Sequence, residues 1–245
     1  LRFGHLMHHR FNRTPIQRSD VSAGAGRPGL RESAWHYFLI TIGLYLFEAA
    51  AALFALLPSR ILEALVARAF GDAMPDGRSM APMARRQLLE APGRSRLRLD
   101  GLVICILFGL GFWFYGAWWW MLALALAARG VLVSLLDNAY HYGNALEDLH
   151  AGYNLRLPEA LQRAFLNFNL HEVHHRHPQA PWSELPRLFR EGGSVHHETL
   201  LRAAFRQFLG LIPEPVAAEG GADLRNRAAD VRRRRTDRTR KVRSR

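Results

Sequence analysis

The fold is decided by residues 102–136, LVICILFGLGFWFYGAWWWMLALALAARGVLVSLL, in which Arg129 is the only charged residue. A membrane-crossing helix needs about 20 predominantly apolar residues, so this stretch is long enough for two short crossings. Gly116 divides the stretch within an aromatic run, and aromatic residues gather where a membrane meets water. We therefore predict a helical hairpin with its tip at Gly116. A buried helical pair is the alternative, but a soluble chain of this length has little room for it.

A second apolar stretch covers about residues 35–58, with Glu48 as its single charge. The flanking residues 1–34 and 59–99 are basic, and the excess of basic residues on the cytoplasmic side of membrane proteins places both there. A hairpin at 102–136 returns the chain to the side on which it started, so the residues before and after it can both lie on the cytoplasmic side. A single crossing at 35–58 would instead place 59–99 outside. Either 35–58 is re-entrant or interfacial, or the division of 102–136 is different.

The net charge of +12 at pH 7 is concentrated at the C-terminus, where residues 225–245 carry +9. We expect a membrane domain at 1–216 and a disordered arginine-rich tail at 217–245. The tail is expected to meet an anionic membrane surface, with no specific nucleic acid as partner. Cys105 is the only cysteine, which excludes a disulfide framework and a metal site built from cysteines.

Beyond residue 136 the sequence resembles that of a soluble helical protein. Pro158 predicts the start of a helix that runs to about Arg176 and ends before Pro178. A loop rich in proline and glycine follows, and the apolar periodicity of residues 194–211 predicts a second helix. The expected fold class is therefore all-α: a helical integral membrane protein with a helical cap on its cytoplasmic side.

Histidine gives the strongest functional signal in this sequence. Twelve are present, and six form two copies of one pattern, H-x-x-H-H: His5, His8 and His9, then His171, His174 and His175. On a helix, positions i, i+3 and i+4 lie on one face, so each copy directs three imidazoles at one volume. Neutral imidazole is a ligand for iron, copper, zinc and nickel. Six ligands exceed the four of one zinc ion. They indicate either two metal ions or a site completed by further residues, for which His141 is the candidate.

These motifs resemble those of the integral-membrane fatty acid desaturase family, which includes alkane hydroxylases and carotenoid-modifying enzymes. The resemblance rests on three stretches, GHLMHHRFN at 4–12, DNAYHYG at 137–143 and NFNLHEVHHRHP at 167–178. It implies that the two patterns are the second and third histidine boxes of a di-iron site and that His141 is a further ligand. Asp137 or Asn138 would be the polar partner of His141, and Glu172 would orient an imidazole. The cap would then face the cytoplasm, from the inner membrane if the source is bacterial.

One family element is missing from this sequence. The first box, H-x(3–4)-H, lies upstream of the second in the family, and here only four residues precede His5. The chain also begins with Leu1 rather than methionine. We therefore expect an N-terminal truncation that removes two iron ligands, and we expect that this polypeptide alone does not assemble a complete two-iron site.

The resemblance also implies the reaction. Two iron ions and O2 would oxidise a fatty acyl lipid or thioester and leave a double bond. The sequence contains no nicotinamide, flavin or haem motif, so the electrons would come from a ferredoxin-, rubredoxin- or cytochrome-type donor. Three alternatives stay open: a hydroxylase or ketolase of an alkyl or carotenoid lipid with the same iron site, an inactive fragment, or a membrane protein that binds or transports a metal ion.

Overall fold

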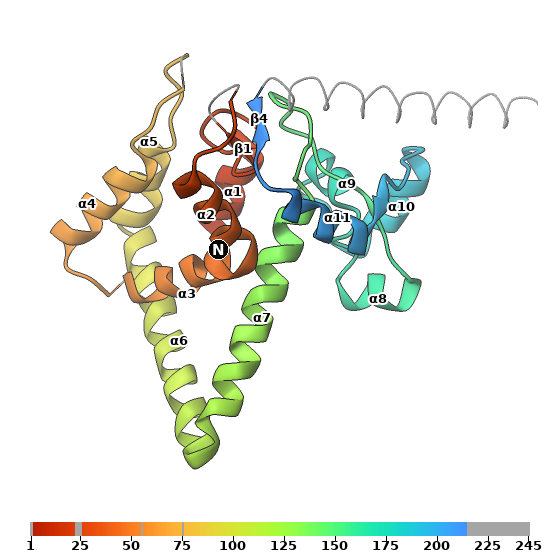
Figure 1. Ribbon diagram of the computed structural model, residues 1–245. Helices are drawn as coiled ribbons and strands as arrows, with labels where there is room; N and C mark the ends of the chain where they lie inside the picture. The colour runs from red at the N-terminus through yellow and green to blue at the C-terminus, as the bar shows by residue number, and fades with distance from the viewer. Residues whose placement is uncertain (1, 23–25, 55, 75, 215–245) are drawn as a thin grey trace, which may run out of the picture. The chain divides into compact units, whose positions relative to one another are not determined.

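The computed structural model describes residues 2–22, 26–54, 56–74 and 76–214, and Figure 1 shows its elements. The described residues are mostly helical, and the strands among them are two residues long. This confirms the helical part of the predicted fold class. The chain forms two compact units, Leu1–His8 with Phe38–Leu135 and His9–Tyr37 with Leu136–Arg245, and each is considered by itself below.

The first unit contains the long apolar helices. Its elements beyond the start of α1 are a π-helical turn at Leu39–Gly43, α3 (Leu44–Phe54), α4 (Ser59–Phe70), α5 (Ala81–Ala84), a π-helical turn at Arg85–Leu89, α6 (Gly93–Tyr115), a 3-10 turn at Gly116–Trp118 and most of α7 (Trp119–Ala139). Helix α3 packs along α6. A small core forms where Leu62 and Val66 of α4 meet Ala84.

Helices α6 and α7 form the predicted hairpin with its tip at Gly116 (Figure 1). Gly116 has φ +49° and ψ −120°, a conformation that glycine adopts without the steric penalty of a Cβ atom. Trp113 and Trp118 flank the tip and are 80% and 61% exposed. The hairpin therefore presents aromatic rings around its turn, as the sequence predicted.

A close helix contact within this unit depends on a second glycine. A Cβ atom at Gly130 of α7 would lie 2.7 Å from a ring carbon of Tyr45 in α3. The Tyr45 backbone N–H donates to Ser134 Oγ at 3.2 Å, and the Arg129 guanidinium lies 5.2 Å from the Tyr45 ring centroid. Small residues let apolar helices approach in this way.

Among the residues that the structure describes, two stretches are long and apolar enough to cross a membrane. One is Leu30–Ala51, in which α2 (Leu30–Phe38) continues through the π-helical turn into α3, and the other is Gly93–Ala139, which contains the hairpin. Few side chains of either stretch are buried. The first agrees with the apolar segment predicted at 35–58, although its helix begins earlier.

The second unit is assembled from short elements. They are the end of α1 (Arg2–Phe11), β1 (Val21–Ser22), α2 up to Tyr37, the end of α7, β2 (Leu155–Arg156), α8 (Glu159–Ala164), α9 (His171–Arg176), α10 (Leu185–Glu191), β3 (Glu198–Thr199), α11 (Leu200–Arg206), a 3-10 turn at Gln207–Leu209 and β4 (Ile212–Pro213). Strand β1 pairs in parallel with β4, and β2 with β3. These short pairings join segments that are far apart in sequence.

The prediction of one helix from Pro158 to Arg176 is wrong. Helix α8 ends at Ala164, and Leu166 and Asn167 then adopt positive φ values of 52° and 57°. Asn167 stabilises the turn because its side-chain amide donates to the Trp182 carbonyl at 3.0 Å. The break separates α8 from α9, so the third histidine box occupies a helix of its own.

The predictions for the C-terminal part are also corrected. The helix expected at 194–211 begins only at Leu200, because Glu198 and Thr199 pair with β2 and Thr199 caps α11 by accepting from the Arg202 N–H. The region predicted as a loop contains α10, which begins at Leu185. The tail expected at 217–245 lies outside the described residues.

Candidate metal centre

Helix α9 carries the third box. His171, His174 and His175 lie at spacings i, i+3 and i+4 in this helix and are all buried. Histidine is seldom fully buried without a partner for its ring nitrogens. Three buried imidazoles on six residues therefore indicate a site rather than a solvated face.

A contact with His171 brings His141 to this helix. His141 follows α7 by two residues, and its Nε2 lies 2.8 Å from Nε2 of His171. The Nε2 of His171 also lies 3.2 Å from Nε2 of His175. The ligand atoms of these three histidines lie within 4.8 Å of one another, so the same edge of each ring faces one small volume.

The second box lies on α1 and meets the third through His9. Nε2 of His9 is 3.0 Å from Nε2 of His174, and its ring centroid is 4.4 Å from that of His175. His5 and His8 lie on the same helix, four residues and one residue before His9, so all three share a helix face. The second unit alone thus unites five of the seven predicted ligands.

The residues present fit a metal ion. Imidazole nitrogens bind such ions at about 2.0–2.1 Å, which places two ligands of one ion roughly 3.0–3.4 Å apart. The separations of 2.8–3.2 Å between Nε2 atoms are close to that range. Nδ1 of His175 contacts the Leu149 carbonyl at 3.2 Å. Because a carbonyl only accepts, Nδ1 carries the proton and Nε2 keeps its lone pair for a metal.

The Leu149 carbonyl is itself held by a residue that sequence reasoning missed. Asn12, directly after helix α1, donates through Nδ2 to the carbonyls of Leu149 and Ala151 at 3.1 and 2.7 Å. Asn12 is buried. It therefore connects the end of the helix that carries the second box to the loop that orients His175.

Tyr140 is a second residue that the sequence did not indicate. Its ring stacks on that of His171, with centroids 4.6 Å apart and planes 16° apart. Burial, aided by the negative charge of Asp137, raises the pKa of Tyr140. Tyr140 therefore stays a neutral phenol and covers one face of His171 with an apolar surface.

The predicted orienting residues lie next to the site. The Asn138 carbonyl accepts from the His141 N–H at 3.0 Å, and its side-chain oxygen accepts from Ser19 at 3.4 Å. Asp137 lies close enough to Tyr140 to affect its pKa. The structure thus gives Asn138 a backbone contact with His141, and the side-chain role expected for Asp137 or Asn138 remains a prediction.

Glu172 fixes the start of α9 through a neighbour. It accepts a hydrogen bond from the Asn154 amide at 2.6 Å and pairs with Arg176. The Asn154 side-chain oxygen accepts from the Val173 N–H at 3.3 Å. His197 completes this arrangement, because its Nδ1 accepts from the Asn154 N–H at 3.0 Å.

A buried ion pair holds the loop after His141. Arg13 and Asp20 lie 2.5 Å apart, with side chains 2% and 8% exposed. The other Asp20 oxygen accepts from the Gly143 N–H at 2.7 Å, and Arg13 donates to the Asn144 carbonyl at 2.9 Å. The segment that follows the second box therefore clamps the turn that carries His141.

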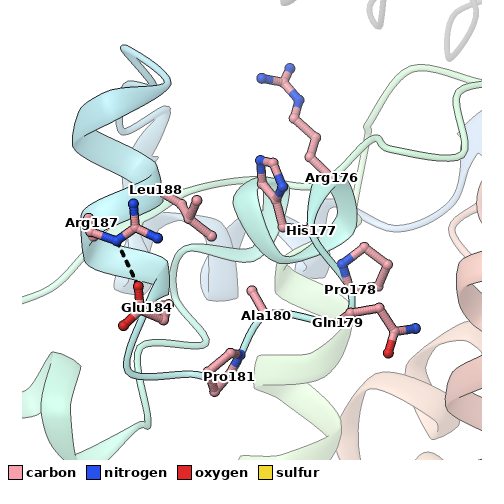
Figure 2. A pocket seen from close by; sticks show the side chains of 9 residues that line it. All are labelled: Arg176, His177, Pro178, Gln179, Ala180, Pro181, Glu184, Arg187 and Leu188. Carbon is pink, nitrogen blue, oxygen red and sulfur yellow. Dashed lines mark hydrogen bonds and ion pairs between the residues drawn. The ribbon is translucent and has the colours of Figure 1, made fainter.

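His177 lies beside the third box and is exposed, unlike the three buried histidines of the box. It lines an open pocket of about 470 Å³ with the ends of α9 and α10 (Figure 2). Arg187 on the far wall pairs with Glu184 in the same view.

His150 supports the third box, because its Nδ1 donates to the His175 carbonyl at 3.1 Å.

Comparisons with known proteins agree with this geometry. A family model described as fatty acid desaturase matches residues 2–236. No curated protein and no solved structure matches the chain. The matched range contains both boxes, His141 and the two apolar stretches, so nearly the whole chain carries the resemblance first indicated by the histidines. The chain belongs to the fatty acid desaturase family.

Proposed function

We propose that the chain is a membrane-bound non-haem di-iron oxidase that introduces a double bond into a fatty acyl chain. The observation that supports it most is the convergence of Nε2 atoms from His141, His171 and His175, with the contact of His9 and His174 beside it. Membership of the desaturase family supplies the class of reaction.

The ligands would form two groups. We propose that His141, His171 and His175 hold one ion and that His9 and His174 hold the other. The family's histidine pattern would add His5 and His8 as further ligands. The helical spacing of the second box supports this, since His5 and His8 share a face with His9. Within the second unit the first group has three histidines and the second has two, so both groups have room for further ligands.

The chemistry requires a metal because no side chain oxidises an unactivated methylene. When bound, the two irons would supply the activation of O2. The balanced change is loss of two hydrogens from adjacent carbons, with O2 and two external electrons plus two protons giving two waters. The electrons would come from a ferredoxin-, rubredoxin- or cytochrome-type donor.

The residues of the chain would hold and enclose the site. His171 and His175 would be buried ligands, the Leu149 carbonyl would hold the ring of His175, and Tyr140 would exclude water from one face of His171. His141 comes two residues after the apolar helix α7. A lipid chain in the bilayer would therefore have a short path to the ligands, which we place on the cytoplasmic side.

Product analysis tests this proposal. The protein is expressed in membranes supplied with iron and a reducing ferredoxin system, and its lipids are compared with those of His171→Ala and of the control His177→Ala. With a segment that carries an H-x(3–4)-H box fused ahead of residue 1, we expect acyl chains that have lost two hydrogens with the wild type and the control only. Products that have gained oxygen would replace the proposal by the hydroxylase or ketolase reading. Unchanged lipids beside iron-loaded protein would contradict it.

A further inference from the structure

Helix α11 and the 3-10 turn after it have apolar side chains on two faces. Leu200, Ala203 and Ala204 are buried against the second unit. The opposite face is exposed and also apolar; its residues, here named the lipid face, are Leu201 (71% exposed), Phe205 (68%), Phe208 (44%) and Leu209 (81%). A helix that is apolar on both sides is typical of one that is covered on both sides.

The position of this helix relative to the candidate membrane spans indicates what covers it. His36 donates from Nε2 to the Gln207 carbonyl at 3.1 Å, and the Tyr37 hydroxyl donates to the Phe208 carbonyl at 3.2 Å. Both histidine and tyrosine belong to the first candidate span, Leu30–Ala51. The 3-10 turn is therefore attached near the start of that span.

The segment that follows the second candidate span contacts the residue after the same turn. This span finishes at Ala139, and the hydroxyl of Tyr142, three residues later, donates to the Gly210 carbonyl at 2.6 Å. Trp35, beside His36, is 52% exposed, as expected of an aromatic residue at a membrane surface. The turn thus lies at the level where both spans would leave the bilayer.

We propose that the lipid face inserts into the interfacial layer of the bilayer, so that α11 lies in the membrane surface. This inference rests on the membrane placement in the proposed function. Four side chains provide too little area for a stable protein interface, which needs about 800 Å² on each partner. Insertion into lipid has no such threshold, and Arg202 beside the face suits anionic headgroups.

Depth-dependent fluorescence quenching tests the proposal with the full chain in vesicles of neutral and anionic lipid. Single cysteines replace Leu201 or Leu209 in a Cys105→Ser background and carry a fluorophore. Arg202→Cys, on the same helix and with its side chain 81% exposed, is the polar control. The native Cys105 in α6 reports on the candidate span itself. All three new sites are exposed, so the fold should tolerate the changes.

We expect brominated lipids to quench the probes at 201, 209 and 105, and aqueous iodide to quench the probe at 202. Iodide quenching at 201 and 209 with lipid quenching at 105 would overturn the interfacial helix and leave the spans intact. Iodide quenching at 105 as well would instead reject the membrane placement. Probes at 201 and 209 could instead be protected from iodide to a degree that grows with protein concentration, without quenching by lipid. That result would show that a second copy of the chain covers the lipid face, and it would also overturn the proposal.

Discussion

The Nε2 atoms of His141 and His171 lie 2.8 Å apart, although thirty residues separate them in the sequence. The intervening chain turns back through the loop at 149–155 and helix α8 before it reaches α9. Several buried polar contacts hold the chain in this path. These contacts support the metal site.

Removal of the Asn12 side-chain amide should weaken metal binding. In Asn12→Leu the carbonyls of Leu149 and Ala151 lose the hydrogen bonds from the Asn12 amide, and the loop that fixes the His175 tautomer is released. Loss of an outer partner of a metal ligand typically lowers metal affinity by about 10- to 100-fold. We expect a rise in the dissociation constant for ferrous iron of at least about tenfold, measured by competition with a chelator.

Gln179→Leu is the matched control for this change, since it removes an amide from the pocket beside the third box. Its iron affinity should equal that of the wild type. Equal affinities for Asn12→Leu and the wild type would show that the loop keeps its position without this donor.

The ion pair of Arg13 and Asp20 should matter strongly for folding. Asp20→Asn leaves the buried Arg13 charge without its partner, a change that costs about 3–5 kcal/mol in buried pairs. Glu159→Gln removes the exposed partner of Arg163, which should cost at most about 1 kcal/mol. Thermal unfolding in detergent compares the two variants, and similar melting temperatures would contradict the role assigned to the buried pair.

Stability should fall in acid partly because of His197. Burial lowers the pKa of His197 below its ordinary value of 6.5, so the unfolded chain binds this proton more readily than the folded one. The folded state therefore loses stability as the pH falls from about 6.5 toward the lowered pKa. Protonation would also remove the lone pair that accepts from the Asn154 N–H.

In His197→Phe the difference in melting temperature between pH 7.5 and pH 5.5 should be smaller than in the wild type, with both proteins free of metal. The variant also loses one hydrogen bond, which costs about 1 kcal/mol at both pH values. An unchanged difference would mean that His197 does not contribute to acid lability.

Local spacing predicted a large part of the site. The i, i+3, i+4 pattern identified the histidines of both boxes, and the apolar stretch around Gly116 predicted the hairpin and its tip. Both signals depend only on residues close together in the chain. The structure agrees with both predictions because helical geometry fixes which neighbouring residues share a face.

The contacts that hold the site were beyond such reasoning. The break at Leu166 and Asn167 depends on the Trp182 carbonyl, and Asn12 acts on Leu149, 137 residues away. Nothing in the local sequence around Asn12 distinguishes it from a surface amide. Its partners exist only once distant segments have packed together.

The iron content of the purified protein tests the central claim most directly. The wild type, His171→Ala and His177→Ala are loaded with ferrous iron without oxygen, washed with a weak chelator and analysed for iron per chain. The account predicts that the wild type and His177→Ala retain equal iron and that His171→Ala loses it. Equal iron in all three proteins, or none in the wild type, would contradict a metal centre built on these histidines.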